Sequence, residues 1–288
     1  MPELPEVETV VRDLRPLLVR RTFTKVSVGR KALRRKWSRT WEAKLLDRCV
    51  AAIERRGKWI QIDLGGPWLL VHLGMTGQFT VVPAVQPIET HTHIIFTLSD
   101  SNELRFRDVR RFGSVTLFPN RETLLSHFEA SGLGPEPFDI DADTWRKSLR
   151  ASRRNLKAIL LDQTIVAGVG NIYADESLFA ASLHPSLLGS DLGSQQAEML
   201  RLAMVKVLTR AIERRGSSIR DYIGGSGLKG KMQEEFGVYG RTGEACPRCG
   251  TTIEKTILAG RSTHFCPRCQ KAAPTHKRRG KQITRPPR

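Results

Sequence analysis

The second and third residues of the chain, Pro2 and Glu3, have side chains and a backbone nitrogen suited to covalent chemistry. A small second residue usually permits removal of the initiator methionine, so we expect Pro2 to present a free secondary amine. An α-amino group has a pKa of about 7.7–8.0, which leaves roughly a quarter of it unprotonated at pH 7.4, against about 0.1% of an ordinary lysine. A neutral amine can attack an electrophilic carbon and form an imine. Glu3 stands beside it as a general acid or base.

On the first eight residues alone, a purely structural role for Pro2 and Glu3 is about as well supported as a catalytic one. Proline is common in the first turn of a helix, and acidic residues there suit the helix dipole. Apolar residues keep helical spacing over 7–18, and we expect Pro16 to end or kink that helix. Features elsewhere in the chain therefore have to decide between the two interpretations.

Four of the five cysteines form two Cys-x-x-Cys pairs, Cys246/Cys249 and Cys266/Cys269, with sixteen residues between the pairs. Each pair can offer two thiolates from one tight turn, which predicts a tetrahedral zinc site. Two disulfides are the alternative, which a reducing cytosol disfavours. Cys49 stands alone in an apolar stretch, and we expect it to be a small core residue.

The charge balance indicates a polyanionic partner. Lys plus Arg is 47 and Asp plus Glu is 29, so the formal net charge is +18 and the pI is about 10.3. Nucleic acid is the expected partner. A membrane surface is the rival, but no basic amphipathic helix, signal peptide or long apolar run stands out. We expect a soluble intracellular protein.

The chain divides into a strand-rich part and a helical part. Short alternating segments with regular turns over 22–120 predict a sandwich or barrel, with an exposed basic loop at 30–40. Glycines and prolines follow at 132–137 and predict a linker. Helical spacing then covers 153–162, a helix that Asn171 can cap runs to about 181, and the longest helix covers 195–215, ending at Gly216.

Two further segments have distinctive compositions. Residues 224–230 form a glycine-rich loop, richer in glycine than a plain connector needs. The tail after residue 271 is basic and rich in proline, and we expect it to be disordered until it meets a polyanion.

The chain resembles the formamidopyrimidine-DNA glycosylase and endonuclease VIII family, and the details favour the formamidopyrimidine branch. The resemblance rests on motifs that occur in family order over about residues 2–271, together with the paired cysteines: Pro2-Glu3-Leu4-Pro5-Glu6-Val7-Glu8, His72-Leu73-Gly74-Met75, Arg110-Arg111-Phe112-Gly113, Gly168-Val169-Gly170-Asn171-Ile172-Tyr173 and Val238-Tyr239-Gly240-Arg241. It implies an α+β fold: an N-terminal β-sandwich with an N-terminal helix, and a helical helix–two-turn–helix domain with a zinc hairpin.

By this resemblance, Pro2 attacks the anomeric carbon of a damaged nucleotide and displaces the base, while Glu3 protonates the opening sugar. Successive β- and δ-eliminations then leave a one-nucleotide gap. Lys58 matches the family's catalytic lysine, and it shares strand parity with Ile60 and Ile62, which places it at the start of their apolar face. Without the resemblance, an end-of-strand lysine that keeps its charge in water is the better interpretation. Arg261, on the tip of the zinc hairpin, matches the family's catalytic arginine.

The resemblance also implies residues that hold the DNA. Met75, Arg110 and Phe112 match wedge residues that enter the base stack and fill the place of an extruded base. Val109 stands where the family usually has proline. This departure affects the expected stiffness of the loop and not the expected contact of Arg110 with the unpaired base.

Four more residues are assigned to DNA binding: His91, Arg153, Lys157 and Asn171. Asn171 at a helix start suits a phosphate, although a simple N-cap is its plainer interpretation. His93 shares parity with His91, and a packed or hydrogen-bonded histidine is expected there.

The resulting hypothesis is a bifunctional glycosylase and abasic-site lyase that removes oxidised purines from double-stranded DNA. It predicts one structural Zn²⁺, no membrane partner, a monomer, and a cytoplasmic, nucleoid-associated bacterial location. The predicted divisions are 1–131, a linker at 132–150, 151–236 with the lesion-capping loop, 237–271 and a tail at 272–288. An endonuclease VIII-type enzyme for oxidised pyrimidines and a non-catalytic zinc-ribbon protein that binds damaged DNA are the alternatives.

Overall fold

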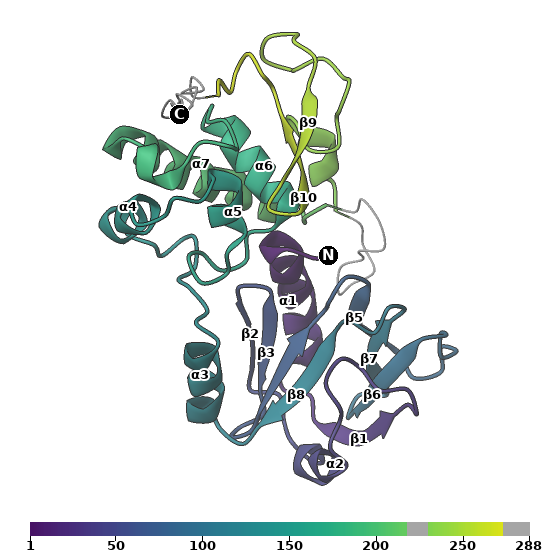
Figure 1. Ribbon diagram of the computed structural model, residues 1–288. Coiled ribbons are helices and arrows are strands. Elements are labelled where there is room, and N and C mark those ends of the chain that lie inside the picture. Colours follow the sequence, from purple (N-terminus) through teal and green to yellow (C-terminus); the bar gives the residue numbers. More distant parts are fainter. Residues whose placement is uncertain (218–229, 273–288) are drawn as a thin grey trace, which may run out of the picture.

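The computed structural model describes residues 1–217 and 230–272. Its N-terminal lobe is a sandwich of two antiparallel four-stranded sheets, which settles the choice between sandwich and barrel (Figure 1). One sheet has the order β1-β6-β7-β5 and the other β2-β3-β4-β8. The strands are β1 (Phe23–Val28), β2 (Ala52–Arg56), β3 (Trp59–Asp63), β4 (Trp68–His72), β5 (Gly77–Pro83), β6 (Thr92–Leu98), β7 (Asn102–Asp108) and β8 (Ser114–Phe118).

Strand alternation explains which face of the second sheet is buried. Ile60 and Ile62 of β3 pair with Val71 and Leu69 of β4, and all four lie in the core between the sheets. Lys58 precedes β3 with the same parity and is only 8% exposed. The predicted position of Lys58 at the rim of the apolar face is therefore confirmed.

Helix α1 (Leu4–Leu18) closes the sandwich core and faces the other lobe at its N-terminal end (Figure 1). Its apolar stripe, from Val7 to Leu18, is buried in the core of the sandwich. Pro16 lies in the last turn of the helix, and only two helical residues follow it before the C-cap at Val19.

Three short helices lie in segments for which the sequence predicted no helix. Helix α2 (Thr40–Leu45) follows the basic loop, whose Leu33 and Trp37 pack against the sandwich core. Helix α3 (Arg121–Ala130) packs Leu124 and Phe128 on the outer face of the second sheet. Helix α4 (Ala142–Arg150) lies within the stretch predicted as a linker, and it buries Trp145 and Leu149 in the helical lobe. The connecting segment is therefore shorter than 132–150.

The helical lobe contains α5 (Leu156–Leu161), α6 (Asn171–Ala180) and α7 (Ser194–Glu213), with short 3₁₀ turns η1 (Gly189–Asp191) and η2 (Met232–Glu235). Helix α7 is the longest described helix, as predicted. Arg214 is the C-cap of α7 and Arg215 follows it with φ 63°, so the left-handed turn that ends the helix begins one residue before the predicted Gly216, which has φ 71°.

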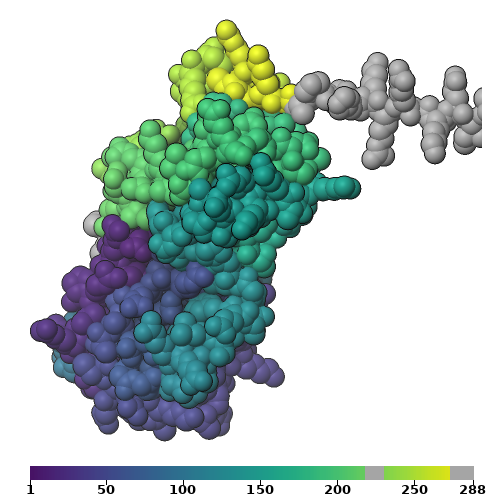
Figure 2. Space-filling view, turned by 90° about the vertical axis from the view of Figure 1, so that its left-hand side faces the viewer, coloured from purple at the N-terminus to yellow at the C-terminus, as the bar shows by residue number. Residues whose placement is uncertain are grey.

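The zinc hairpin, β9 (Glu254–Leu258) and β10 (Arg261–Phe265), lies beyond the helical lobe. Figure 2 shows the molecule as an elongated body, with the sandwich at one end and the hairpin at the other. Among the described residues, no helix is long and apolar enough to cross a membrane. The predicted capping loop, except for Gly230, and the predicted disordered tail beyond Ala272 lie outside the described residues.

One prediction about the core is wrong. Cys49 is exposed, whereas the next residue, Val50, is completely buried in the sandwich. Alternation of side chains along an extended segment places neighbours on opposite faces, and the larger apolar side chain takes the inner one.

Candidate active site between the lobes

The carboxylate of Glu3 joins the two lobes. Its oxygens accept hydrogen bonds from three backbone N–H groups at the start of α6: Gly170 at 2.8 Å, Ile172 at 2.9 Å and Tyr173 at 3.3 Å. These donors are the unpaired N–H groups that every helix exposes at its first turn. A Cβ on Gly170 would come within 2.3 Å of Cδ of Glu3, so only glycine permits this approach.

The N-cap interpretation of Asn171 is therefore wrong. Gly170 is the N-cap of α6, and Asn171 is its first helical residue. The Asn171 side chain instead donates from Nδ2 to the backbone oxygen of Ser262 on β10, at 3.0 Å. Asn171 thus links the start of α6 to the zinc hairpin.

Burial gives Glu3 an unusual protonation equilibrium. The side chain is 3% exposed, and desolvation raises its pKa above the ordinary value of 4.5. Positive Lys58 opposes that rise, and negative Glu6 adds to it. Glu6 itself accepts hydrogen bonds from the backbone N–H of Glu3 at 2.9 Å and the hydroxyl of Tyr173 at 2.6 Å. Glu3 is therefore an acid that can hold a proton at higher pH than an exposed glutamate.

Lys58 reaches the same junction from the sandwich. Its Nζ donates to the carbonyl oxygen of Val169 at 2.9 Å, one residue before the N-cap of α6. Burial lowers the Lys58 pKa below 10.5, although Glu3 and Glu6 act in the opposite direction. The positive charge of Arg261 also lowers the Lys58 pKa. Figure 1 shows the β9–β10 turn directed toward the N-terminal end of α1.

Buried carboxylates of α6 hold the zinc hairpin in this position. Asp175 accepts from the backbone N–H of His264 at 2.9 Å and lies 3.0 Å from Nδ1 of the same residue. Its other oxygen accepts from Nζ of Lys157 at 2.6 Å. Glu176 accepts from three consecutive backbone N–H groups at the entry to the zinc-binding segment, residues 237–239.

The assignment of Lys157 to direct DNA contact is not supported. The side chains of Lys157 and Asp175 are both 0% exposed, and the ammonium also donates to the backbone oxygen of Asn171 at 2.8 Å. An ammonium enclosed by these partners cannot reach a phosphate. Lys157 instead supports the side of α6 that carries Asp175.

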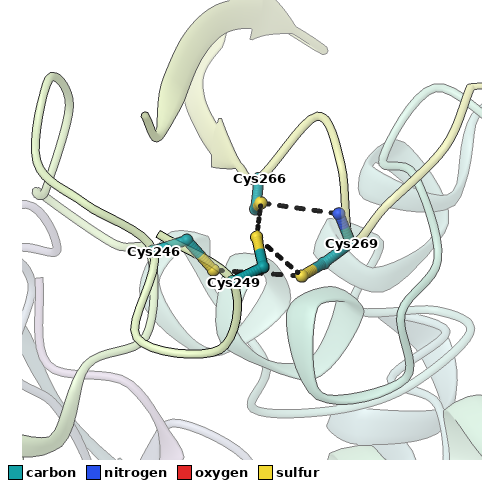
Figure 3. A group of neighbouring side chains, drawn as sticks. All are labelled: Cys246, Cys249, Cys266 and Cys269. Atoms are coloured by element: carbon teal, nitrogen blue, oxygen red, sulfur yellow. Dashed lines mark hydrogen bonds between the residues drawn. The ribbon is translucent and has the colours of Figure 1, made fainter. Parts of the chain in front are cut away.

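The four cysteines converge on one point (Figure 3). Their Sγ atoms all lie within 4.8 Å of one another, with separations of 3.9 Å for Cys246–Cys269, 3.5 Å for Cys249–Cys266 and 3.4 Å for Cys249–Cys269. Four thiolates around one Zn²⁺ at about 2.3 Å would be about 3.8 Å apart. Disulfide-bonded sulfurs would be separated by only about 2.05 Å. The set therefore fits a single zinc ion and does not form disulfides.

The predicted wedge residues occupy two turns at the edge of the sandwich. Met75 is half-buried in the turn between β4 and β5. Arg110 and Phe112 are exposed in the turn between β7 and β8, with the guanidinium carbon 4.6 Å from the centre of the Phe112 ring. Phe112 is 46% exposed, so part of its ring is accessible for contact outside the chain.

The two remaining predicted DNA contacts differ in exposure from the neighbouring His93. His91 and Arg153 are exposed. His93 is buried and donates from Nε2 to the backbone oxygen of Asp108 at 2.9 Å, as the packed interpretation predicted.

His72 is a polar residue of the site that the sequence argument did not single out. Burial and the nearby cations Lys58, Arg34 and Arg35 lower its pKa to about 4, so the ring is neutral at pH 7. Its Nδ1 accepts from the backbone N–H of Gly74 at 3.0 Å, which leaves Nε2 as the protonated nitrogen. His72 ends β4 with the parity of Trp68 and Leu70, which pack on the outer face of the sheet, so strand periodicity gave no signal for it.

Three family models match the chain. They are described as the formamidopyrimidine-DNA glycosylase N-terminal domain at residues 1–115, the formamidopyrimidine-DNA glycosylase H2TH domain at residues 133–222, and the zinc finger found in FPG and IleRS at residues 243–272.

Similar proteins cover nearly the whole chain. The formamidopyrimidine-DNA glycosylase of Geobacillus kaustophilus is 43% identical over 94% of this chain and 100% of its own length. That of Carboxydothermus hydrogenoformans is 42% identical with the same coverage. A Lactococcus lactis FPG mutant bound to DNA containing Fapy-dG superimposes with a TM-score of 0.88 at 38% identity, again over 94% of this chain and all of that one. A structure of MutM with DNA containing carbocyclic 8-oxo-G gives 0.87 at 38% identity, with the same coverage.

Proposed function

The chain belongs to the formamidopyrimidine-DNA glycosylase family, and we propose that Pro2, Glu3, Lys58 and Arg261 carry out its chemistry. It is a bifunctional DNA glycosylase and abasic-site lyase of base-excision repair, acting on 8-oxoguanine and formamidopyrimidine lesions. The observation that carries the residue assignment is the buried Glu3 carboxylate beside Pro2, at the junction where Lys58 and the zinc hairpin also meet.

The reaction begins at Pro2. Its neutral nitrogen attacks C1′ of the damaged nucleotide, the bond from C1′ to the base breaks, and the base leaves with the bonding electrons and takes up a proton. Protonated Glu3 donates its proton to the ring oxygen as the sugar opens, which leaves an iminium between Pro2 and C1′. The raised pKa of Glu3 supports this role, because it increases the protonated fraction.

The iminium then drives strand cleavage. It acidifies C2′, and loss of a proton there expels the 3′ phosphate by β-elimination. A second proton loss expels the 5′ phosphate by δ-elimination, and water finally releases the sugar fragment from Pro2. In this proposal, Arg261 and Lys58 supply positive charge to the phosphates that leave.

The remaining residues hold the substrate. Met75 and Phe112 take the space of the extruded nucleotide, and Arg110 offers donors to the base left unpaired. His91, Arg153 and Asn171 hold phosphates in this proposal, and the exposure of His91 and Arg153 supports that role. The cysteine cluster holds one structural Zn²⁺, because four protein ligands leave no open position for chemistry.

The partner is double-stranded DNA that contains oxidised bases or abasic sites, in agreement with the DNA-bound relatives. The relatives of known source are bacterial. We propose that the protein acts as a monomer in the cytoplasm, associated with the nucleoid.

Incision assays on a panel of lesions test the substrate assignment against the endonuclease VIII alternative. We expect excision of 8-oxoguanine to be roughly tenfold to a hundredfold faster opposite cytosine than opposite adenine, because a good bidentate contact to the opposite base contributes about 1–3 kcal/mol of discrimination. Arg110→Ala should reduce this preference and leave cleavage of a preformed abasic site largely intact. Preference for thymine glycol, or equal rates opposite the two bases, would contradict the assignment.

A further inference from the structure

Three turns that carry proposed DNA contacts meet at Asp108, the last residue of β7. The turn before β5 carries Met75, the turn before β6 carries His91, and the turn after β7 carries Arg110 and Phe112. Asp108 is 0% exposed. A completely buried carboxylate is costly unless its hydrogen bonds are satisfied, so its partners are informative.

The carboxylate of Asp108 ties two of these turns together. Its Oδ1 accepts from the hydroxyl of Thr76, next to Met75, at 2.5 Å and from the backbone N–H of Arg110 at 3.2 Å. Its Oδ2 accepts from the backbone N–H of Gly113 at 2.8 Å. The Arg110 N–H also lies 3.1 Å from the Thr76 hydroxyl oxygen. The carboxylate therefore holds the Arg110–Gly113 turn at both ends.

The backbone of Asp108 holds the third turn. Its N–H donates to the carbonyl oxygen of His91 at 3.0 Å. Its carbonyl oxygen accepts from Nε2 of the buried His93 at 2.9 Å. One residue thus bonds to all three turns.

The chemistry of the three donors requires a carboxylate rather than an amide. The hydroxyl of Thr76 and the N–H groups of Arg110 and Gly113 all point at the two oxygens of Asp108. An asparagine has only one acceptor oxygen, so in either orientation its NH₂ group would face an N–H donor. One end of the Arg110–Gly113 turn would be released in each case.

The two wedge turns are also in direct contact, which leaves little space for adjustment. A Cβ on Gly74 would lie 2.5 Å from the nitrogen of Gly113. Arg111, between the two wedge residues, has φ 57°, a conformation that is unfavourable for a residue with a Cβ. Such a conformation persists only where surrounding contacts fix it, and the bonds to Asp108 are those contacts.

We infer that Asp108 is a positioning residue that makes Met75, Arg110 and Phe112 act as one rigid wedge, and that this rigidity sets the discrimination of the opposite base. The inference rests on the proposed roles of the three wedge residues. Asp108 touches neither the DNA nor the reacting atoms, because it is completely buried.

Asp108→Asn is the isosteric test, with Asp63→Asn as the matched control. Asp63 also caps a turn of the same lobe, by accepting from the backbone N–H of Gly65 at 2.9 Å, but that turn lies between β3 and β4. We expect Asp108→Asn to reduce the rate ratio for 8-oxoguanine opposite cytosine and adenine about tenfold, the equivalent of roughly one hydrogen bond to a charged group. Cleavage of a preformed abasic site in single-stranded DNA, which has no opposite base, should change less than twofold in this prediction. The Asp63→Asn control should match the wild type in both assays.

A second pair of variants separates positioning from general loss of folding. Thr76→Val removes the hydroxyl at nearly constant volume, and Thr76→Ser keeps it. Thr76→Val should shift the cytosine/adenine ratio in the same direction as Asp108→Asn, and Thr76→Ser should preserve most of the wild-type ratio. Equal losses on every substrate, in parallel with a lower Tm, would identify Asp108 as a folding residue only and overturn the inference.

A spectroscopic measurement keeps this test independent of the catalytic assignments. With 2-aminopurine beside an abasic-site analogue, saturating wild-type protein should increase the fluorescence as the wedge disturbs the stack, and Asp108→Asn should give a smaller increase. An equal increase for the two proteins overturns the inference. Borohydride trapping could fail while the expected fluorescence difference between the wild type and Asp108→Asn is present. That combination would contradict the proposed role of Pro2 and leave the role of Asp108 intact.

Discussion

At the scale of single residues, Glu3 has both a structural and a chemical role. Its backbone accepts the first hydrogen bond of α1, from Val7 at 3.0 Å, and its side chain receives the first N–H groups of α6. The acid is therefore fixed by both lobes, in a position where burial raises its pKa. The competing structural and catalytic interpretations of the N-terminal residues are compatible, because the same carboxylate can do both.

The pH dependence of base release tests the role of Glu3. As a general acid, Glu3 must be protonated, and its protonated fraction falls as the pH rises through a pKa that lies above 4.5. Because the attacking Pro2 nitrogen must be neutral while Glu3 is protonated, the pH profile of single-turnover excision should be bell-shaped, with a fall at high pH caused by loss of the Glu3 proton. Glu3→Gln should be slower and should lose this fall at high pH. The same raised pKa contributes stability that is complete below pH 4.5 and is lost as the pH rises through the folded-state pKa. An unchanged profile in Glu3→Gln would show that another group supplies the proton.

Residue-level prediction succeeded where the signal was local and failed where the partner is distant in sequence. Strand parity with Ile60 was enough to place Lys58 on the inner face. The burial of Lys157 depends on its ion pair with Asp175, eighteen positions later, and hydrophobic periodicity cannot predict such a pair. The role of Glu3 as acceptor for α6 depends on a glycine, Gly170, that is 167 positions away.

At the scale of elements, helix α6 connects the N-terminal lobe to the zinc hairpin. Its first turn receives Glu3 of the N-terminal lobe. Its Asp175 and Glu176 hold the zinc hairpin and the segment that leads into it. The position of Arg261 relative to Lys58 therefore depends on one helix and on the metal that orders the hairpin.

Loss of the metal should separate these elements. Cys249→Ser removes one of four zinc ligands, in sites whose apparent binding free energy is about 10–16 kcal/mol in finger peptides. We expect the variant to lose bound zinc and DNA incision while the β-sandwich stays folded, since its core does not include the hairpin. Zinc content, incision rate and circular dichroism measure the three effects.

Cys49→Ser is the matched control, because Cys49 is exposed and far in sequence from the cysteine cluster. It should keep zinc and activity. Full incision by Cys249→Ser without bound zinc would contradict the structural role of the metal.

Element boundaries were predicted to within a few residues where the sequence marks them and poorly where packing decides. Helix α7 ends at Glu213, and Arg215, with φ 63°, begins the left-handed turn one residue before the predicted Gly216. The helix α4 was missed because the prolines before it indicated a linker, whereas Trp145 and Leu149 fold the segment onto α7 and its neighbours. The Trp145 indole donates to the backbone oxygen of Ala197 on α7 at 2.9 Å, a tertiary contact without a local signature.

At the scale of the whole molecule, the formal charge of +18 predicts affinity that depends strongly on salt. The logarithm of the affinity should fall linearly with the logarithm of the salt concentration, with a slope near −0.9 for each neutralised phosphate. Arg153→Ala should weaken binding to all DNAs similarly and flatten that slope by about one unit. Titrations at several salt concentrations on damaged and undamaged duplexes measure both quantities.

Arg210→Ala is a suitable control for this measurement, since Arg210 already pairs with Glu235 at 2.7 Å and with Glu213 at 3.1 Å. Its removal should leave the slope unchanged. A loss of affinity confined to lesion-containing DNA would contradict a pure phosphate role for Arg153.

The most direct test of the account is to trap the covalent intermediate and locate it. Borohydride should reduce the iminium between the wild-type protein and abasic DNA, and digestion should place the adduct on the N-terminal tryptic peptide, residues 2–12. A form that retains Met1 should not trap, because its Pro2 nitrogen is part of a peptide bond, and Pro2→Gly should trap more slowly than the wild type. Trapping of both variants at the full wild-type rate, or an adduct on a lysine such as Lys58, would contradict the assignment of Pro2 as the nucleophile.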